Sequence, residues 1–167
     1  SHMELQKPFG ITGKLLNKDT AEEIWELTKE KLADPAFSAR GLIRQFNVEV
    51  LCTTDDPVDD LPYHEMIASQ NNFKTKVLPA FRPDKLFKTG DLRQWTSYVD
   101  DLSGAAGMEI SRFDELLAAL EKRMDFFHAR GCRLADHGLE QLPAVPFTSE
   151  QVERTFAALR TGRPPSQ

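Results

Sequence analysis

Apolar and polar positions follow two different rhythms along this chain. The segment SRFDELLAALEKRMDFFHAR, residues 111–130, repeats its apolar positions at helical spacing, which predicts a long helix packed on one face. Its apolar stripe comprises Phe113, Leu116, Leu117, Leu120, Met124 and Phe127. Further helices are predicted over 20–33, 35–46, 59–69 and 91–102, with a last one beginning at Thr148. The segment SGAAG, 103–107, has the composition of a linker.

Polar residues at the predicted helix starts support these helices. Thr20 precedes Glu23 by three residues and Thr148 precedes Gln151 by three, which is the spacing of a capping box. Ser111 is predicted to cap the longest helix. Local sequence therefore marks where these helices begin.

Three short segments have strand character instead. They are NVEVLCTTDDP (47–57), TKVLPAF (75–81) and CRLAD (132–136). Pro79 inside the second predicts an irregular strand end or a bulge, because proline cannot donate to a ladder. Strands that alternate with helices indicate βαβ units, a parallel sheet and right-handed crossovers, so the predicted fold class is α/β.

Composition is that of one globular domain. The chain has 167 residues, of which 40% are hydrophobic and 28% charged, so a buried core is expected. The net charge is −5 and basic residues are scattered, which argues against a nucleic-acid partner. No apolar stretch approaches the ~20 residues that cross a bilayer, so no membrane association is expected.

The chain ends and the cysteines refine this description. Ser1-His2-Met3 is typical of the remnant of an expression tag. Residues 162–167 are typical of a ragged tail. Cys52 and Cys132 lie in apolar runs and are predicted to be buried reduced thiols, although a disulfide stays open. Low cysteine usage without an export signal predicts a cytoplasmic protein.

Ionisable residues follow all three predicted strands, in the motifs TTDDP, FRPDK and ADHG. Ligands of parallel α/β folds bind at the carboxyl ends of strands, so a shared site is expected there. Arg82 is suited to hold a carboxylate or phosphate through two hydrogen bonds. Asp136 can accept a proton or a hydrogen bond from a sugar hydroxyl, and His137 can act as an acid or a ligand.

Structural interpretations of the same residues remain open. Arg82 could pair with Asp84 or Asp55 within a loop. Asp136 could cap a turn before Gly138, and His137 could be an ordinary loop residue. Asp55, with Asp56, could cap the helix that follows.

Motifs for a self-contained metalloenzyme or serine hydrolase are missing from the sequence. The four histidines show no HxH or HExxH spacing, and there is no CxxC, GxSxG or glycine-rich phosphate loop. The residues of this chain therefore predict no metal site of their own.

Three longer motifs resemble the uronate isomerase family, also called glucuronate isomerase. They are RGLIRQFNVEVLCTTDDPVDDLPYH, KVLPAFRPDK and FFHARGCRLADHGLE, and the resemblance extends over roughly residues 4–160. It implies membership of the amidohydrolase superfamily and a (β/α)8 barrel. It also implies interconversion of D-glucuronate with D-fructuronate and of D-galacturonate with D-tagaturonate, with a divalent metal, often zinc, at the barrel mouth.

The resemblance also assigns roles to residues. Arg82, Asp84 and Asp55 are expected to bind the substrate, and Asp136 and His137 to take part in catalysis. The HxH metal pair of the family precedes the region matched here, and a further histidine, arginines and a metal-binding aspartate follow it.

The chain is therefore expected to be an internal fragment with about three of the eight strands. It would comprise a helical region over 4–46 and a partial barrel over 47–161. We expect such a fragment to lack activity, to bind no metal and to form a homo-oligomer through its unpaired edges. The alternatives are a catalytically silent sugar-acid-binding or scaffold domain, and another hydrolase of the amidohydrolase type.

Overall fold

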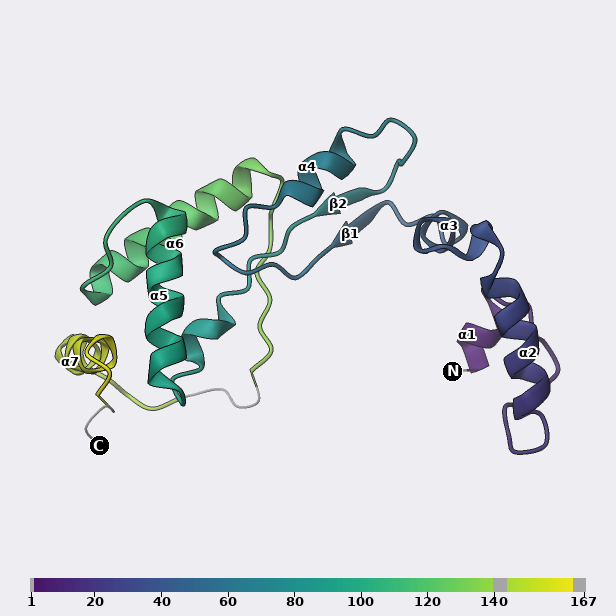
Figure 1. Ribbon diagram of the computed structural model, residues 1–167, viewed down its shortest axis with the longest axis horizontal. Coiled ribbons are helices and arrows are strands. Elements are labelled where there is room, and N and C mark those ends of the chain that lie inside the picture. The colour runs from purple at the N-terminus through teal and green to yellow at the C-terminus, as the bar shows by residue number, and fades with distance from the viewer. Residues whose placement is uncertain (1, 140–143, 164–167) are drawn as a thin grey trace. The chain divides into compact units, whose positions relative to one another are not determined.

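The computed structural model describes residues 2–139 and 144–163, and it divides into two compact units (Figure 1). The first unit contains Ser1–Leu51 and Gln70–Lys76, and the second contains Cys52–Ser69 and Val77–Gln167. All the candidate site residues belong to the second unit.

The first unit is mostly helical. Its helices are α1 (His2–Gln6), α2 (Ala21–Leu32), the 3-10 turn η1 (Pro35–Phe37) and α3 (Ala39–Gln45). The single helix predicted over 35–46 is therefore split. Asp34 caps η1 by accepting from the Ala36 N–H at 2.8 Å, and Ser38 caps α3 by accepting from the Gly41 N–H at 3.2 Å.

The predicted capping box of α2 is wrong. The Thr20 hydroxyl donates to the Leu15 carbonyl oxygen at 2.5 Å and makes no cap hydrogen bond. Glu23 forms an ion pair with Lys14 instead of reaching back to Thr20. His2, in the predicted tag remnant, lies in α1, and its Nε2 accepts from the Leu16 N–H at 2.9 Å.

The sheet has two regular strands, β1 (Val50–Cys52) and β2 (Lys76–Leu78). Parallel pairing continues past both strands at an isolated bridge between Asp55 and Phe81. The predicted third strand, 132–136, forms only one such bridge, between Phe81 and Ala135. The α/β class is confirmed. The prediction of three strands is wrong, because only two of the three segments form regular strands.

Two prolines explain why the third segment forms no ladder. Backbone N–H groups alternate between the two sides of a strand, and that of Phe81 donates to the Leu134 carbonyl oxygen at 3.2 Å. The next positions on that side are Pro79 and Pro83, which have no N–H. β2 ends at Leu78, directly before Pro79, as the irregular strand end predicted there requires.

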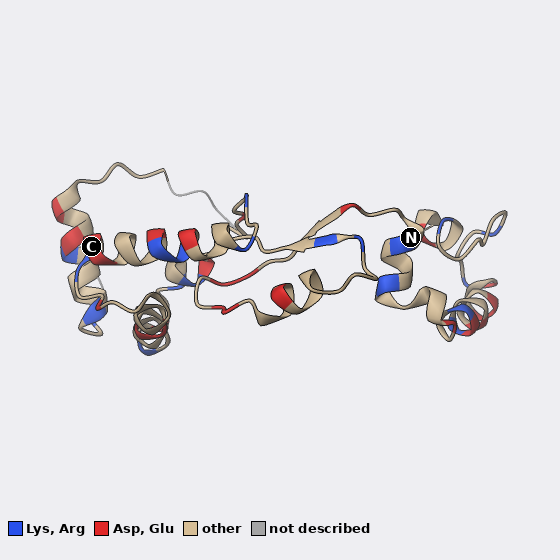
Figure 2. Ribbon diagram, turned by 90° about the horizontal axis from the view of Figure 1, so that it is seen from above, with Lys and Arg blue, Asp and Glu red and all other residues tan. Residues whose placement is uncertain are grey.

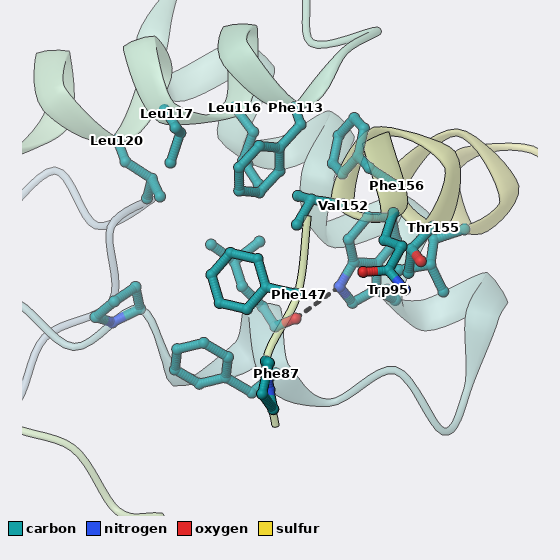
Figure 3. Close-up of a pocket in the computed structure, with 15 residues that line it drawn as sticks. Phe87, Trp95, Phe113, Leu116, Leu117, Leu120, Phe147, Val152, Thr155 and Phe156 are labelled. Carbon is teal, nitrogen blue, oxygen red and sulfur yellow. Dashed lines mark hydrogen bonds between the residues drawn. The ribbon is translucent and has the colours of Figure 1, made fainter. Parts of the chain in front are cut away.

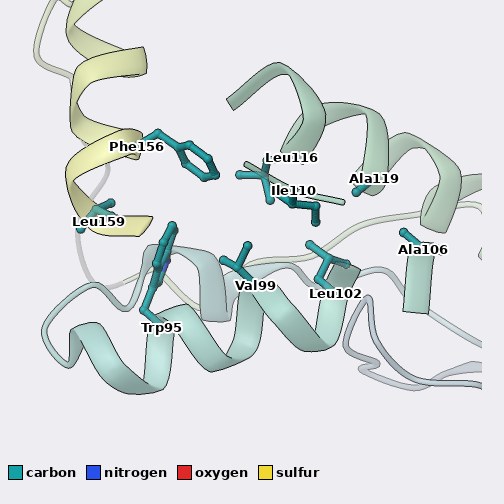
Figure 4. Packing of buried hydrophobic residues seen from close by; sticks show 9 residues of the cluster. All are labelled: Trp95, Val99, Leu102, Ala106, Ile110, Leu116, Ala119, Phe156 and Leu159. Atoms are coloured by element: carbon teal, nitrogen blue, oxygen red, sulfur yellow. The ribbon is translucent and has the colours of Figure 1, made fainter. Parts of the chain in front are cut away.

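The helices of the second unit are α4 (Pro62–Ala68), the 3-10 turn η2 (Asp84–Phe87), α5 (Leu92–Ala106), α6 (Phe113–Ala129) and α7 (Ser149–Arg160). Helices α5, α6 and α7 contribute most of the side chains of the main hydrophobic core (Figure 4). Its buried members are Trp95, Val99, Leu102, Ala106, Ile110, Leu116, Ala119, Phe156 and Leu159. Helix α5 continues through the predicted linker and ends at Gly107, whose φ of 61° favours glycine.

Helix α6 buries part of the predicted stripe, and Phe113 and Leu120 of that stripe pack against the core while partly exposed. Leu116 and Phe127 are buried as predicted, but Leu117 is 51% exposed and Met124 is 47% exposed. Arg123 is buried on the same helix at 4% exposure.

Its start is also shifted by one residue from the Ser111 cap. Arg112 precedes the first helical residue, and the Glu115 carboxylate accepts from the N–H groups of Ser111 and Arg112. The capping box of α7 is confirmed, because Thr148 and Gln151 exchange both of its hydrogen bonds.

The remaining general expectations have mixed outcomes. Both cysteines are free thiols, and Cys132 is buried, but Cys52 is exposed, so its predicted burial is wrong. Basic and acidic residues are interspersed along the ribbon (Figure 2). Among the helices of 2–139 and 144–163, none is long and apolar enough to cross a membrane. Residues 164–167 of the predicted tail lie outside the described residues.

Candidate active site

Arg82 and Asp136 meet because the segments that carry them pair through Phe81. The residues just before them, Phe81 and Ala135, form a parallel bridge, so the next position of each segment lies at the same edge. The Arg82 Nη2 donates to Asp136 Oδ2. That hydrogen bond raises the pKa of the Arg82 guanidinium, against the opposing effect of desolvation. The structure thus brings together two residues that the sequence placed at different strand ends.

Asp84 connects the same pair to His137. Its Oδ1 lies 2.8 Å from His137 Nδ1, and its Oδ2 accepts from the Gly138 N–H at 2.6 Å and lies 4.0 Å from Arg82 Nε. The Gly138 hydrogen bond is the main cause that lowers the pKa of the Asp84 carboxyl, with His137 and Arg82 acting in the same direction. Asp84 begins η2, which holds it at this edge.

Asp55 joins the site through both its backbone and its side chain. Its carbonyl oxygen accepts from the Arg82 N–H at 3.0 Å. Its Oδ2 accepts from the Thr53 hydroxyl at 2.6 Å and from the Ala80 N–H at 3.2 Å. Asp55 does not cap α4, which begins at Pro62 after a left-handed Leu61.

Asp56 has partners that the sequence did not reveal. The Tyr98 hydroxyl donates to Asp56 Oδ1 at 2.8 Å, and Lys85 Nζ lies 3.2 Å from Asp56 Oδ2. Burial, with a smaller contribution from this carboxylate, raises the pKa of the Tyr98 hydroxyl far above its ordinary value. Tyr98 and Lys85 are separated from Asp56 by tens of residues, so no local pattern could have predicted these contacts.

The role of Arg123 was also not predicted from the sequence. It lies within the apolar pattern of α6, and its guanidinium donates to the carbonyl oxygens of Pro57, Asp59 and Ala105 at 2.6, 2.9 and 3.1 Å. Burial lowers the pKa of this guanidinium. Arg123 therefore holds the loop that follows Asp55 and Asp56 against α6.

A polar cavity of about 620 Å³ opens beside these residues. Its lining includes Asp55, Arg82, Asp84 and Lys85. Asp136 and His137 do not line it, but they contact the lining residues Arg82 and Asp84. Two buried polar atoms here, Arg82 Nε and Asp136 Oδ1, have no hydrogen-bond partner within the described residues. Such atoms are rare in proteins.

A second cavity, of about 500 Å³, has the opposite character (Figure 3). Side chains such as Phe87, Trp95, Phe113, Phe147 and Phe156 surround it. Trp95 Nε1 donates to the Leu86 carbonyl oxygen at 2.9 Å, so its polar atom is already satisfied. No charged side chain lines this cavity among the described residues, so it is unsuited to an anionic sugar.

The side chains that the structure describes do not fit a metal centre. Residues 2–139 and 144–163 contain no group of three or more His, Cys, Asp or Glu side chains placed to hold an ion. Asp84 and His137 form a pair only, and both are already engaged with each other.

Two solved structures similar to this chain are a uronate isomerase and a glucuronate isomerase. Uronate isomerase from Thermotoga maritima aligns with a TM-score of 0.82 and 33% identity over 99% of this chain and 36% of that chain. Glucuronate isomerase from Caulobacter crescentus aligns with a TM-score of 0.78 and 25% identity over 95% of this chain and 32% of that chain. Residues 1–167 match the family described as glucuronate isomerase, and the chain belongs to that family.

Curated relatives agree with this assignment. Uronate isomerase of Cellvibrio japonicus is 45% identical over 160 residues, which cover 96% of this chain and 34% of the relative. Uronate isomerase of Salmonella newport is 51% identical over 146 residues, which cover 87% of this chain and 31% of the relative. The chain thus spans about a third of the length of the relatives that it matches.

Proposed function

We propose that this chain supplies the carboxylate-binding part of a uronate isomerase. The whole enzyme would interconvert D-glucuronate with D-fructuronate and D-galacturonate with D-tagaturonate in the cytoplasm. The observation that carries the proposal is the convergence of Arg82, Asp136 and the Asp84–His137 pair beside one polar cavity. Within it, this chain forms part of a (β/α)8 barrel that other segments of the protein complete.

Arg82 binds the carboxylate of the uronate. Asp136 accepts from one N–H of Nη2, so the Nη1 end of the guanidinium is left to donate to the ligand. The Arg82 side chain is 34% exposed and lines the cavity, which supports this role. The described lining carries three cations, Arg82, Lys85 and Lys88, and three carboxylates, so an anionic sugar would bind the cations in competition with the carboxylates.

Asp136 and His137 serve the isomerisation itself. The reaction moves a proton between C1 and C2 of the sugar, so it needs a base beside the carbonyl. Asp84 accepts a hydrogen bond from Nδ1 of His137, which leaves Nε2 as the nitrogen that exchanges a proton. Asp136, whose side chain is 40% exposed, accepts a hydrogen bond from a sugar hydroxyl.

The metal expected for this family would not be bound by the residues described here. A divalent cation such as zinc would polarise the sugar carbonyl in the complete enzyme. Its ligands come from other segments, since the described residues do not form a ligand set. The roles assigned to Arg82, Asp136 and His137 do not depend on it.

Calorimetry with glucuronate and galacturonate tests the proposal. We expect the 167-residue chain to bind at least one of them, and Arg82→Ala to abolish the heat of binding because the carboxylate loses its donors. Arg112→Ala is the matched control, since Arg112 is an exposed arginine paired with Asp114 away from the site. Binding that survives in Arg82→Ala would contradict the role of Arg82. Binding by neither protein would favour a scaffold domain.

A further inference from the structure

His64 and Thr53 form a hydrogen-bonded group with Asp55 that the proposed mechanism does not use. Thr53 Oγ1 lies 2.7 Å from His64 Nε2 and 2.6 Å from Asp55 Oδ2. The side chains of His64 and Asp55 are only 11% and 13% exposed. We infer that Thr53 and His64 are positioning residues, which hold Asp55 so that its second oxygen can accept a hydrogen bond from a hydroxyl of the sugar acid. This inference rests on the proposed function.

The chemistry of the hydroxyl gives this chain of hydrogen bonds a direction. A carboxylate offers only lone pairs, and Asp55 Oδ2 at 2.6 Å is a closer acceptor than the Leu78 carbonyl oxygen at 3.3 Å, so the single proton of the Thr53 hydroxyl points to Asp55. Thr53 Oγ1 then acts as the acceptor toward His64, and His64 Nε2 must carry the proton. The order of donation is His64 to Thr53 to Asp55.

Burial of the other ring nitrogen favours the same tautomer. His64 Nδ1 is buried and has no hydrogen-bond partner within the described residues. A proton on Nδ1 would leave a buried N–H without an acceptor, which is rarer in proteins than an unused lone pair. Geometry at both nitrogens therefore selects the Nε2–H form.

In this arrangement one carboxylate oxygen of Asp55 binds protein groups and the other is left for the ligand. Oδ2 is occupied by Thr53 and by the Ala80 N–H at 3.2 Å. Oδ1 receives no protein hydrogen bond among the described residues, and Asp55 lines the same polar cavity as Arg82. An acceptor held at this position suits a sugar hydroxyl, while Arg82 holds the carboxylate of the same molecule.

Nuclear magnetic resonance on the 15N-histidine-labelled chain tests the direction of donation. We expect long-range 1H–15N spectra to show His64 as the Nε2–H tautomer, with His64→Asn used to assign its signals. Thr53→Ser keeps the hydroxyl and should preserve the tautomer and the amide shift of Ala80. Thr53→Val removes it and should change both. An Nδ1–H tautomer in the unmodified chain, or spectra unchanged in Thr53→Val, would overturn the inference.

Binding separates this inference from the function on which it rests. Thr53→Val should weaken glucuronate binding about tenfold, the loss expected for one hydrogen bond, and Thr53→Ser should restore it. Equal binding by all three proteins would overturn the positioning role. Absence of glucuronate binding by the unmodified chain, with the tautomer as expected, would overturn the proposed function and leave the hydrogen-bond chain standing.

Discussion

The Asp84 carboxylate connects Gly138, His137 and Arg82 at the site. It accepts from the Gly138 N–H at 2.6 Å, contacts His137 Nδ1 at 2.8 Å and faces Arg82. All three interactions favour the ionised carboxyl and lower its pKa. A carboxyl whose pKa is lower in the folded state stabilises the fold above its unfolded pKa, and this contribution is lost as pH falls through the folded value.

Asp84→Asn should reveal this contribution. At neutral pH we expect the variant to lose about 1–2 kcal/mol of unfolding free energy, because the charge-assisted hydrogen bonds weaken. The difference should begin to shrink below about pH 4, the ordinary pKa of an unfolded aspartate, and disappear as pH falls through the lowered pKa of the folded Asp84 carboxyl. Urea unfolding at several pH values measures it, with Asp125→Asn as the exposed control. A difference that stays constant with pH would contradict the electrostatic explanation.

The residues of the site could be predicted from the sequence, but which of them pair with each other could not. The strand-end motifs singled out Arg82, Asp84, Asp136 and His137, and all four meet at one place. The partner considered for Arg82 from the sequence was Asp84 or Asp55, whereas its hydrogen bond goes to Asp136. Proximity along the chain suggested the first two, and pairing between segments 54 residues apart decided the third.

At the scale of elements, α6 has a structural role that its sequence does not suggest. The helix buries Arg123 and directs its guanidinium to three carbonyl oxygens. Two of these belong to the loop after Asp55 and Asp56, and the third to the end of α5. A buried arginine of this kind replaces water as the donor for carbonyl groups that would otherwise lack one.

Arg123→Met should therefore destabilise the fold strongly. We expect a loss of about 2–4 kcal/mol of unfolding free energy, because three carbonyl groups lose their donors while the apolar stem is kept. Arg112→Met at the start of the same helix should change it by less than about 0.5 kcal/mol. Urea denaturation of both variants makes the comparison. Equal effects would show that burial of Arg123 contributes no more than a surface charge.

At the scale of the whole molecule, the chain is a segment of a larger fold. It spans about a third of its relatives, and its two regular strands leave edges that no described residue of the chain pairs. Val50 lies on β1 and is 50% exposed. Unpaired strand edges with exposed apolar side chains favour association between copies.

The purified chain should consequently self-associate and fail to isomerise glucuronate. We expect sedimentation velocity to show a mass that rises with concentration, and Val50→Lys to shift it toward the monomer, because a charge on an edge strand opposes pairing. Val145→Lys, at an exposed apolar position outside the strands, should leave the mass unchanged. Measurable turnover of glucuronate by the 167-residue chain would contradict the prediction of inactivity.

The amino-acid sequence was sufficient for the α/β class, the order of most elements and the motifs at the strand ends. These follow from periodicity, cap residues and turn residues, whose effects extend over only a few positions. Tertiary structure decided which side chains contact each other. It decided the pairing of Arg82 with Asp136, the burial of Arg123 and the series of hydrogen bonds from His64 to Asp55. It also decided the failure of the third strand, because Pro79 and Pro83 matter only once their side of the backbone faces a neighbour. Such contacts depend on the register between distant segments, which no local pattern encodes.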